Sequence, residues 1–110
     1  MDKKNSDPPW SESLESASRW LLAMAHPLRL LISELLLIRE YHLRELVIKC
    51  KAQQSLVLWH LKILAENGVI AKRKEGLKTF YWTEDKRLPA LIQSLQGLQG
   101  KFPDSEKRGI

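Results

Sequence analysis

The side chains able to ligate a metal or act as a nucleophile are few and widely spaced in this chain. It has three histidines, His26, His42 and His60, and one cysteine, Cys50. A zinc site needs Cys and His ligands at close spacing, and these positions provide none. Ser55 has no Asp–His relay nearby in sequence, and no Gly-rich phosphate loop or paired acidic motif is present. We therefore expect no enzyme, no metal site and no cofactor.

Basic side chains are more informative. The 110 residues include 18 Lys and Arg against 13 Asp and Glu, a formal net charge of +5 at pH 7. This excess favours a polyanionic partner, because Lys and Arg neutralise phosphates and release their counterions. Four basic residues surround Gly76, namely Lys72, Arg73, Lys74 and Lys78. The cluster predicts a phosphate-contacting surface, with a solvated hairpin face as the alternative.

The residues before this cluster have the spacing of a helix. Val57, Leu61 and Leu64 fall at i, i+4 and i+7, which is one face of an α-helix. We expect the helix to run from Gln53 to Asn67 and to end at Gly68, since glycine readily takes the left-handed conformation that ends helices.

The cluster itself has the pattern of a hairpin. Val69 to Lys74 alternates imperfectly between apolar and polar residues, and Thr79 to Thr83 is a β-branched and aromatic run. Glu75 to Lys78 is then a short loop that contains glycine. A helix leading into a basic hairpin is the layout of a winged helix-turn-helix, in which one element enters a DNA groove and the hairpin reaches the flanking backbone.

The rest of the chain is predicted to complete a single, mainly α domain with five helices and this small β-hairpin. Capping residues and Pro27 help to place the other elements. We expect a helix from Ser11 or Ser13 to about Ala25, a buried helix at Leu28–Leu37, a short strand at Tyr41-His42, a helix at Leu43–Lys49 and a last helix within Glu84–Gln99. The domain spans residues 11–99, with flexible segments at 1–10 and 100–110.

The first and last helices carry apolar residues that a chain of this length cannot fully hide. The first helix has an expected inner stripe of Leu14, Ala17, Leu21 and Ala25. Exposed apolar stripes mark partner interfaces, and a symmetric homodimer is the usual closure. The candidate interface residues are Leu14, Leu21, Leu88, Leu91, Ile92 and Leu95. The alternative is that the apolar residues of both helices only contribute to the hydrophobic core of a monomer.

The chain has no sequence signal for a membrane or an oxidising compartment. The longest apolar run, near Leu28–Ile38, is interrupted by Arg29, Ser33 and Glu34. We expect no signal peptide, no membrane span and a cytoplasmic location. A single cysteine also precludes an intramolecular disulfide.

Two stretches of the sequence resemble a known family. AMAHPLRLLISELL, at residues 23–36, is similar to the ALADPTRLRILELL opening of the ArsR/SmtB repressors, and residues 44–82 look like their helix-turn-helix and wing. The resemblance covers about residues 14–99. It implies a dimeric repressor that joins its subunits through the first and last helices and binds double-stranded DNA at an inverted-repeat operator.

The family's metal ligands are missing from the matching positions. Metal-sensing members carry a Cys-x-Cys pair where this chain has His42 and Arg44. At the family's second site, Asp85 is followed two residues on by Arg87. An arginine has no lone pair to donate to a metal ion. The resemblance therefore implies a member without the metal-sensing function.

Cys50 falls where relatives carry an apolar core residue. We expect a buried thiol that behaves as a small hydrophobic side chain. The alternative is a redox-sensing thiol, with a pKa lowered by Lys49 and Lys51.

The predicted DNA-reading helix is more apolar than the family pattern. Its outward side has Ser55, Leu56, Trp59, Lys62 and Ile63, where the family usually has Ser, Thr, Arg and Lys. In one interpretation the apolar side chains contact thymine methyls or sugars and leave the glutamines to hydrogen-bond bases. In the other, the Leu56/Trp59 face binds a protein partner, and DNA binding is weak or lost. The candidate DNA contacts are Gln53, Gln54, Ser55, Leu56, Trp59, His60, Lys62, Arg73, Lys74 and Lys78.

Overall fold

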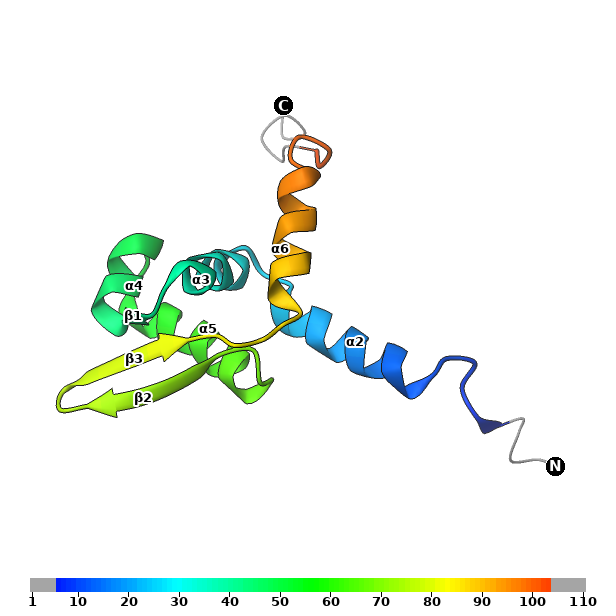
Figure 1. Cartoon of the computed structure of the whole chain (residues 1–110), viewed down its shortest axis with the longest axis horizontal. Helices are drawn as coiled ribbons and strands as arrows, with labels where there is room; N and C mark the ends of the chain where they lie inside the picture. Colours follow the sequence, from blue (N-terminus) through cyan, green and yellow to red (C-terminus); the bar gives the residue numbers. More distant parts are fainter. Residues whose placement is uncertain (1–5, 104–110) are drawn as a thin grey trace.

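Helices and a small sheet follow one another in the order that the sequence predicts (Figure 1). The computed structural model describes residues 6–103, so parts of the two predicted flexible segments, residues 1–5 and 104–110, lie outside the described residues. The elements are α2 (Glu12–Met24), α3 (Pro27–Ile38), β1 (Tyr41–His42), α4 (Leu43–Cys50), α5 (Gln54–Glu66), β2 (Ala71–Glu75), β3 (Lys78–Trp82) and α6 (Leu88–Gly97). Over residues 6–103, these five helices and the hairpin confirm the predicted winged helix-turn-helix fold class.

The buried centre of the domain is α3, as its nearly continuous apolar sequence predicts. Pro27 occupies the first turn of α3, where its missing N–H costs no hydrogen bond. The His26 Nδ1 atom accepts the backbone N–H of Leu28 at 3.0 Å and so caps the helix. Ile32 and Leu36 lie in the hydrophobic core cluster with side chains from α2, α4, α5 and α6.

The helix-turn-helix consists of α4 and α5. Lys51 ends α4 with a left-handed φ of +51°, which lets the chain reverse within a few residues. On α5, Val57, Leu61 and Leu64 are all buried, which confirms the predicted inner face of this helix. The opposite side of α5 is consequently turned to solvent.

The sheet is antiparallel with strand order β1-β3-β2, so β3 lies in the middle. Its hairpin turn is shorter than the loop predicted at 75–78, because Glu75 and Lys78 pair with each other as the last residues of their strands. The turn is therefore Gly76-Leu77. Gly76 has a φ of +62°, and a two-residue hairpin turn needs such a left-handed residue.

The terminal helices α2 and α6 project away from the rest of the chain (Figure 1). α2 packs only through its C-terminal end, where Trp20, Ala23 and Met24 are buried. The predicted inner stripe of α2 is wrong for the single chain, since Leu14, Ala17, Leu21 and Ala25 are all exposed. The physical reason is that, within residues 6–103, no other helix or strand runs beside the N-terminal part of α2 (Figure 1).

Among the helices of residues 6–103, none is by itself long and apolar enough to cross a membrane. The pair α2 and α3, bent by 96° at their junction, reaches the required length and composition only when taken together. α3 contributes to this pair as the buried core helix.

Candidate nucleic-acid interface

The outward face of α5 is exposed from its first residue onward. Gln53 precedes the helix without using its side-chain amide as a cap, and Gln54 and Ser55 begin the helix. Leu56 and Trp59 follow with 46% and 56% of their surface exposed. This face therefore offers amide and hydroxyl groups at its N-terminal end and two large apolar side chains beside them.

Lys62 lies one turn further along the same face. Its ammonium group is 5.9 Å from the centroid of the Trp59 ring and 4.0 Å from the Glu66 carboxylate. The cation is thus shared between an aromatic face and a carboxylate, both of them exposed to solvent.

His60, predicted as a DNA contact, is buried and does not reach the surface of α5. Its Nδ1 atom accepts a hydrogen bond from Arg29 Nη1 at 3.1 Å, and its ring centroid lies 4.2 Å from that of His26. Burial, followed by the nearby charges of His26 and Arg29, lowers the pKa of His60, so its imidazole is neutral. The sequence carried a signal for this burial, because His60 lies at i+3 from the buried Val57.

The hairpin, or wing, presents exposed lysines to solvent. Lys72 and Lys74 lie on β2, and Lys78 begins β3. Within the described part of the chain, none of these three ammonium groups is held in an ion pair, and all three side chains are exposed. They are available to phosphate oxygens.

Arg73, also predicted as a DNA contact, is engaged by carboxylates of the protein itself. Its Nη1 and Nη2 atoms donate to the two carboxylate oxygens of Glu40, and its Nε atom donates to Glu75 at 2.8 Å. The guanidinium carbon lies 4.8 Å and 5.5 Å from the ring centroids of Phe80 and Trp82. Arg73 therefore ties β2 to the segment between α3 and β1, and its hydrogen bonds lower the pKa of Glu40. Sequence reasoning missed this role, since Glu40 is 33 residues away.

Two residues predicted for a dimer interface on α6 are buried within the chain itself. Leu88 and Ile92 are buried, because they lie on the side of α6 that packs on α3. Buried in this way, these two side chains offer no free surface to a second copy of the chain. Leu91 and Leu95 are half-buried and keep some surface free.

On α2, the predicted interface residues are open to solvent. Leu14 and Leu21 are 60% and 50% exposed, and the neighbouring Leu22 is 67% exposed. A helix with three such leucines has apolar surface to bury against a partner.

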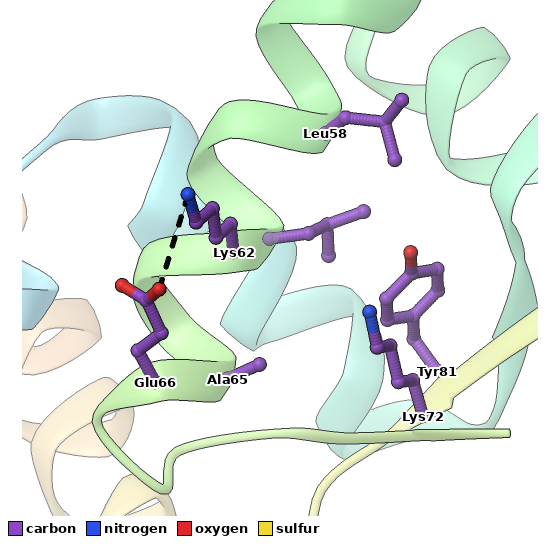
Figure 2. Close-up of a pocket in the computed structure, with 7 residues that line it drawn as sticks. Leu58, Lys62, Ala65, Glu66, Lys72 and Tyr81 are labelled. Carbon is purple, nitrogen blue, oxygen red and sulfur yellow. Dashed lines mark ion pairs between the residues drawn. The ribbon is translucent and has the colours of Figure 1, made fainter.

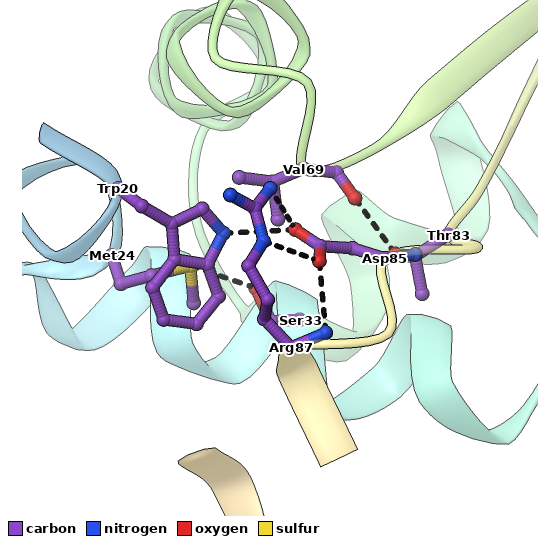
Figure 3. Close-up of polar contacts among 7 residues, drawn as sticks. All are labelled: Trp20, Met24, Ser33, Val69, Thr83, Asp85 and Arg87. Atoms are coloured by element: carbon purple, nitrogen blue, oxygen red, sulfur yellow. Dashed lines mark hydrogen bonds and ion pairs between the residues drawn. The ribbon is translucent and has the colours of Figure 1, made fainter. Parts of the chain in front are cut away.

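The Asp85 carboxylate, at a position matching a family metal ligand, is saturated by donors from the chain (Figure 3). Trp20 Nε1 donates to it at 2.8 Å, and Arg87 donates from Nε at 2.7 Å and from Nη2 at 2.8 Å. Burial by itself raises the pKa of Asp85, but these hydrogen bonds outweigh it and the net pKa is lowered. The contacts join the end of α2 to the residues that lead into α6. Over residues 6–103, no group of three or more His, Cys, Asp or Glu side chains is placed to hold a metal ion.

Cys50 is half-buried at the end of α4 and packs against the hydrophobic core. Burial raises the pKa of its thiol. This direction is opposite to the lowered pKa that the alternative of a redox-sensing thiol beside Lys49 and Lys51 requires, and both lysines are exposed. The thiol behaves as a small hydrophobic side chain.

Comparisons with known proteins agree with this geometry. No family model matches the chain. It is 34% identical over 85 residues to the HTH-type transcriptional repressor SmtB of Mycobacterium tuberculosis, a match that covers 77% of this chain but only 63% of the repressor. It is 31% identical over 88 residues to an uncharacterized HTH-type transcriptional regulator of Methanocaldococcus jannaschii, covering 79% of this chain and 99% of the regulator.

A solved structure has the same fold. HlyU from Vibrio cholerae superposes with a TM-score of 0.75 at 31% identity, covering 82% of this chain and 98% of HlyU. The fold, with an exposed α5 beside a basic hairpin, defines a winged helix-turn-helix protein. The chain belongs to the ArsR/SmtB family of such proteins.

Proposed function

We propose that the protein is a transcriptional repressor that binds double-stranded DNA as a homodimer in the cytoplasm. The observation that carries this proposal is the exposed N-terminal end of α5 beside a wing with three unpaired lysines. A helix of this kind fits the major groove, and the wing lysines suit the flanking phosphates. The repressor and regulator names of its relatives support the same function.

The dimer would be closed by α2 and α6. Leu14, Leu21 and Leu22 supply exposed apolar surface on α2, and Leu91 and Leu95 supply half-buried surface on α6. The two-fold symmetry of such a dimer leads us to expect an inverted-repeat operator with half-sites about 10 bp apart, centre to centre, or a multiple of that.

Selection of bound sequences from random duplex DNA tests the proposal directly. We expect an inverted repeat to emerge, bound by a dimer in sedimentation, with log K falling steeply as log salt rises. A protein that is monomeric at micromolar concentration and enriches no sequence would overturn it.

Lys74 gives a finer test of the wing. Because a phosphate contact carries no sequence information, Lys74→Ala should weaken binding to all sequences about equally and reduce the salt slope by roughly one. A loss confined to one base position would make Lys74 a base reader, and an unchanged slope would exclude it as a phosphate contact.

A further inference from the structure

A groove of about 530 Å³ lies between α5 and the sheet (Figure 2). One side consists of apolar side chains from the middle and C-terminal part of α5: Leu58, Leu61 and Ala65. The other side consists of Lys72 from β2 and Tyr81 from β3. Its volume is within the range of small-molecule sites, and its lining has the usual combination of apolar walls and few polar groups.

The Tyr81 hydroxyl supplies a hydrogen-bonding group to this groove. The residue is only 3% exposed, and burial raises its pKa, so the hydroxyl keeps its proton. Figure 2 shows the hydroxyl directed into the groove, and no hydrogen bond within residues 6–103 engages it. Among the described residues, the fully buried side-chain polar atom without a hydrogen-bond partner is Arg29 Nε, so the Tyr81 hydroxyl keeps contact with solvent at the groove. It can therefore exchange water for a hydrogen bond to a molecule in the groove.

A cation lies beside the Tyr81 ring because of the strand register. Lys72 and Tyr81 are directly paired across β2 and β3, so their side chains are neighbours on one face of the sheet. Figure 2 shows the Lys72 ammonium beside the Tyr81 ring, whereas the other lysine of the groove, Lys62, is turned to Glu66 at 4.0 Å. Lys72 is therefore the cation left free to bind an anion next to the hydroxyl.

We propose that this groove binds a small organic acid with an apolar body. Its carboxylate accepts hydrogen bonds from Lys72 and Tyr81, and its apolar body lies against Leu58, Leu61 and Ala65. The apolar wall favours such an amphipathic acid over a bare phosphate, which would leave the leucines in contact with water. The bound acid would touch both α5 and the wing, so it is placed to change their relative position. Only this regulatory consequence rests on the proposed function.

The test is a titration of the isotope-labelled full chain, without DNA, with decanoate and with indole-3-acetate, followed by NMR. We expect saturable shifts at the C-terminal half of α5 and at β2 and β3 for at least one acid. The matched neutral compounds, decanol and indole-3-acetamide, should bind more weakly. Lys72→Met and Tyr81→Phe keep the apolar part of each side chain and should each weaken binding by about three- to tenfold. Lys86→Met removes an exposed charge outside the groove and should leave the affinity unchanged.

Two results would overturn the proposal. One is the absence of saturable shifts in the groove up to millimolar concentrations of both acids; if Lys72→Met also weakened DNA binding in a separate titration, the groove would be part of the contact with the DNA backbone. The second is equal binding of the neutral compounds, or no effect of Lys72→Met and Tyr81→Phe. Because the titration contains no DNA, failure of the DNA-binding proposal would leave its result intact.

Discussion

At the scale of single residues, Trp59 distinguishes a DNA-reading α5 from a protein-docking one. Its indole is 56% exposed on the outward face of the helix. In the DNA-bound state we expect the duplex to cover it, so Trp59→Ala should lower operator affinity by about 1–3 kcal/mol. The melting temperature should hardly change, since the side chain lies outside the core.

Ile48→Ala is the matched control for this experiment. Ile48 is 72% exposed on α4, so its truncation removes apolar surface without touching α5. If Trp59→Ala left DNA binding intact but abolished capture of a protein partner, the Leu56/Trp59 face would be a docking surface. A fall in melting temperature alone would make Trp59 a packing residue.

A second prediction at the scale of single residues concerns His60, which should make the stability of the protein depend on pH. In the folded protein its pKa is lowered by burial and by the charges of His26 and Arg29. The unfolded chain takes up the proton near the ordinary pKa of about 6.5, so below that pH it binds more protons than the folded chain. The free energy of unfolding should therefore be highest above pH 6.5 and decrease as the pH falls below it.

Urea unfolding between pH 8 and pH 5 measures this effect. His60→Gln offers Arg29 a neutral acceptor and should flatten the profile between about pH 7 and pH 5.5. His42→Gln, at a half-buried histidine beside Glu45, is the control and should keep the slope. An unaltered slope in His60→Gln would show that another group is responsible.

At the scale of elements, the position of the wing depends on the contact between Glu40 and Arg73. These residues join β2 to the segment that precedes β1, and both are partly exposed. Glu40→Gln should loosen the wing, which would appear as faster amide hydrogen exchange in β2 and β3. Global stability should change little, because exposed ion pairs contribute little to it.

Glu75→Gln is the control for the wing. It removes the carboxylate that Arg73 meets within its own strand and leaves the long-range contact in place, so hydrogen exchange should stay close to that of the parent protein. If amide hydrogen exchange in β2 and β3 were equally fast in Glu40→Gln and Glu75→Gln, the ion pair between Glu40 and Arg73 would not be what holds the wing in position.

The spacing of apolar residues was sufficient to predict the helices and strands, but not which of them pack against each other. Val57, Leu61 and Leu64 identified the inner face of α5, because a helix buries one face whichever element covers it. The stripes on α2 and α6 look alike in sequence, yet Leu88 is buried and Leu14 is exposed. Only the position of α3 beside α6 decides between them, and such a tertiary contact leaves no periodic signal in the chain.

The same limit applies to the candidate DNA contacts. The exposed residues at the start of α5 were predictable from the helix face and the family resemblance. The contact of Arg73 with Glu40 was not, since residues 33 positions apart meet only once the sheet has formed. The turn at Gly76 brings Lys72 and Tyr81 together across the hairpin, and this pairing depends on its length.

At the scale of the whole molecule, the basic surface of the wing and the exposed apolar surface of the terminal helices lie in different places. The hairpin tip points away from α2 and α6 (Figure 1), so the basic wing and the apolar terminal helices do not compete for one partner. The Asp85 contacts with Trp20 and Arg87 fix the end of α2 against the start of α6. Both helices of the proposed dimer interface are thereby held in a defined orientation relative to each other.

This arrangement leads us to expect that dimerisation and DNA affinity are lost together. Leu21→Asp places a charge on the exposed apolar surface of α2. Burying that charge in a dimer should cost about 2 kcal/mol or more, roughly thirtyfold in the dimer dissociation constant. The folded protomer should be unaffected, since Leu21 is 50% exposed in it. Sedimentation measures the dimer, and operator titration measures the affinity.

Ile48→Asp is the control, because it adds the same charge at an exposed apolar residue of α4, remote from α2 (Figure 1). It should leave the dimer intact. A monomer reads one half-site at a time and loses the gain from linking two half-sites, so Leu21→Asp should bind a full operator little better than a single half-site. A variant that stayed dimeric would place the interface elsewhere, and a monomer with full operator affinity would show that the protein reads DNA without the two-fold symmetry proposed for it.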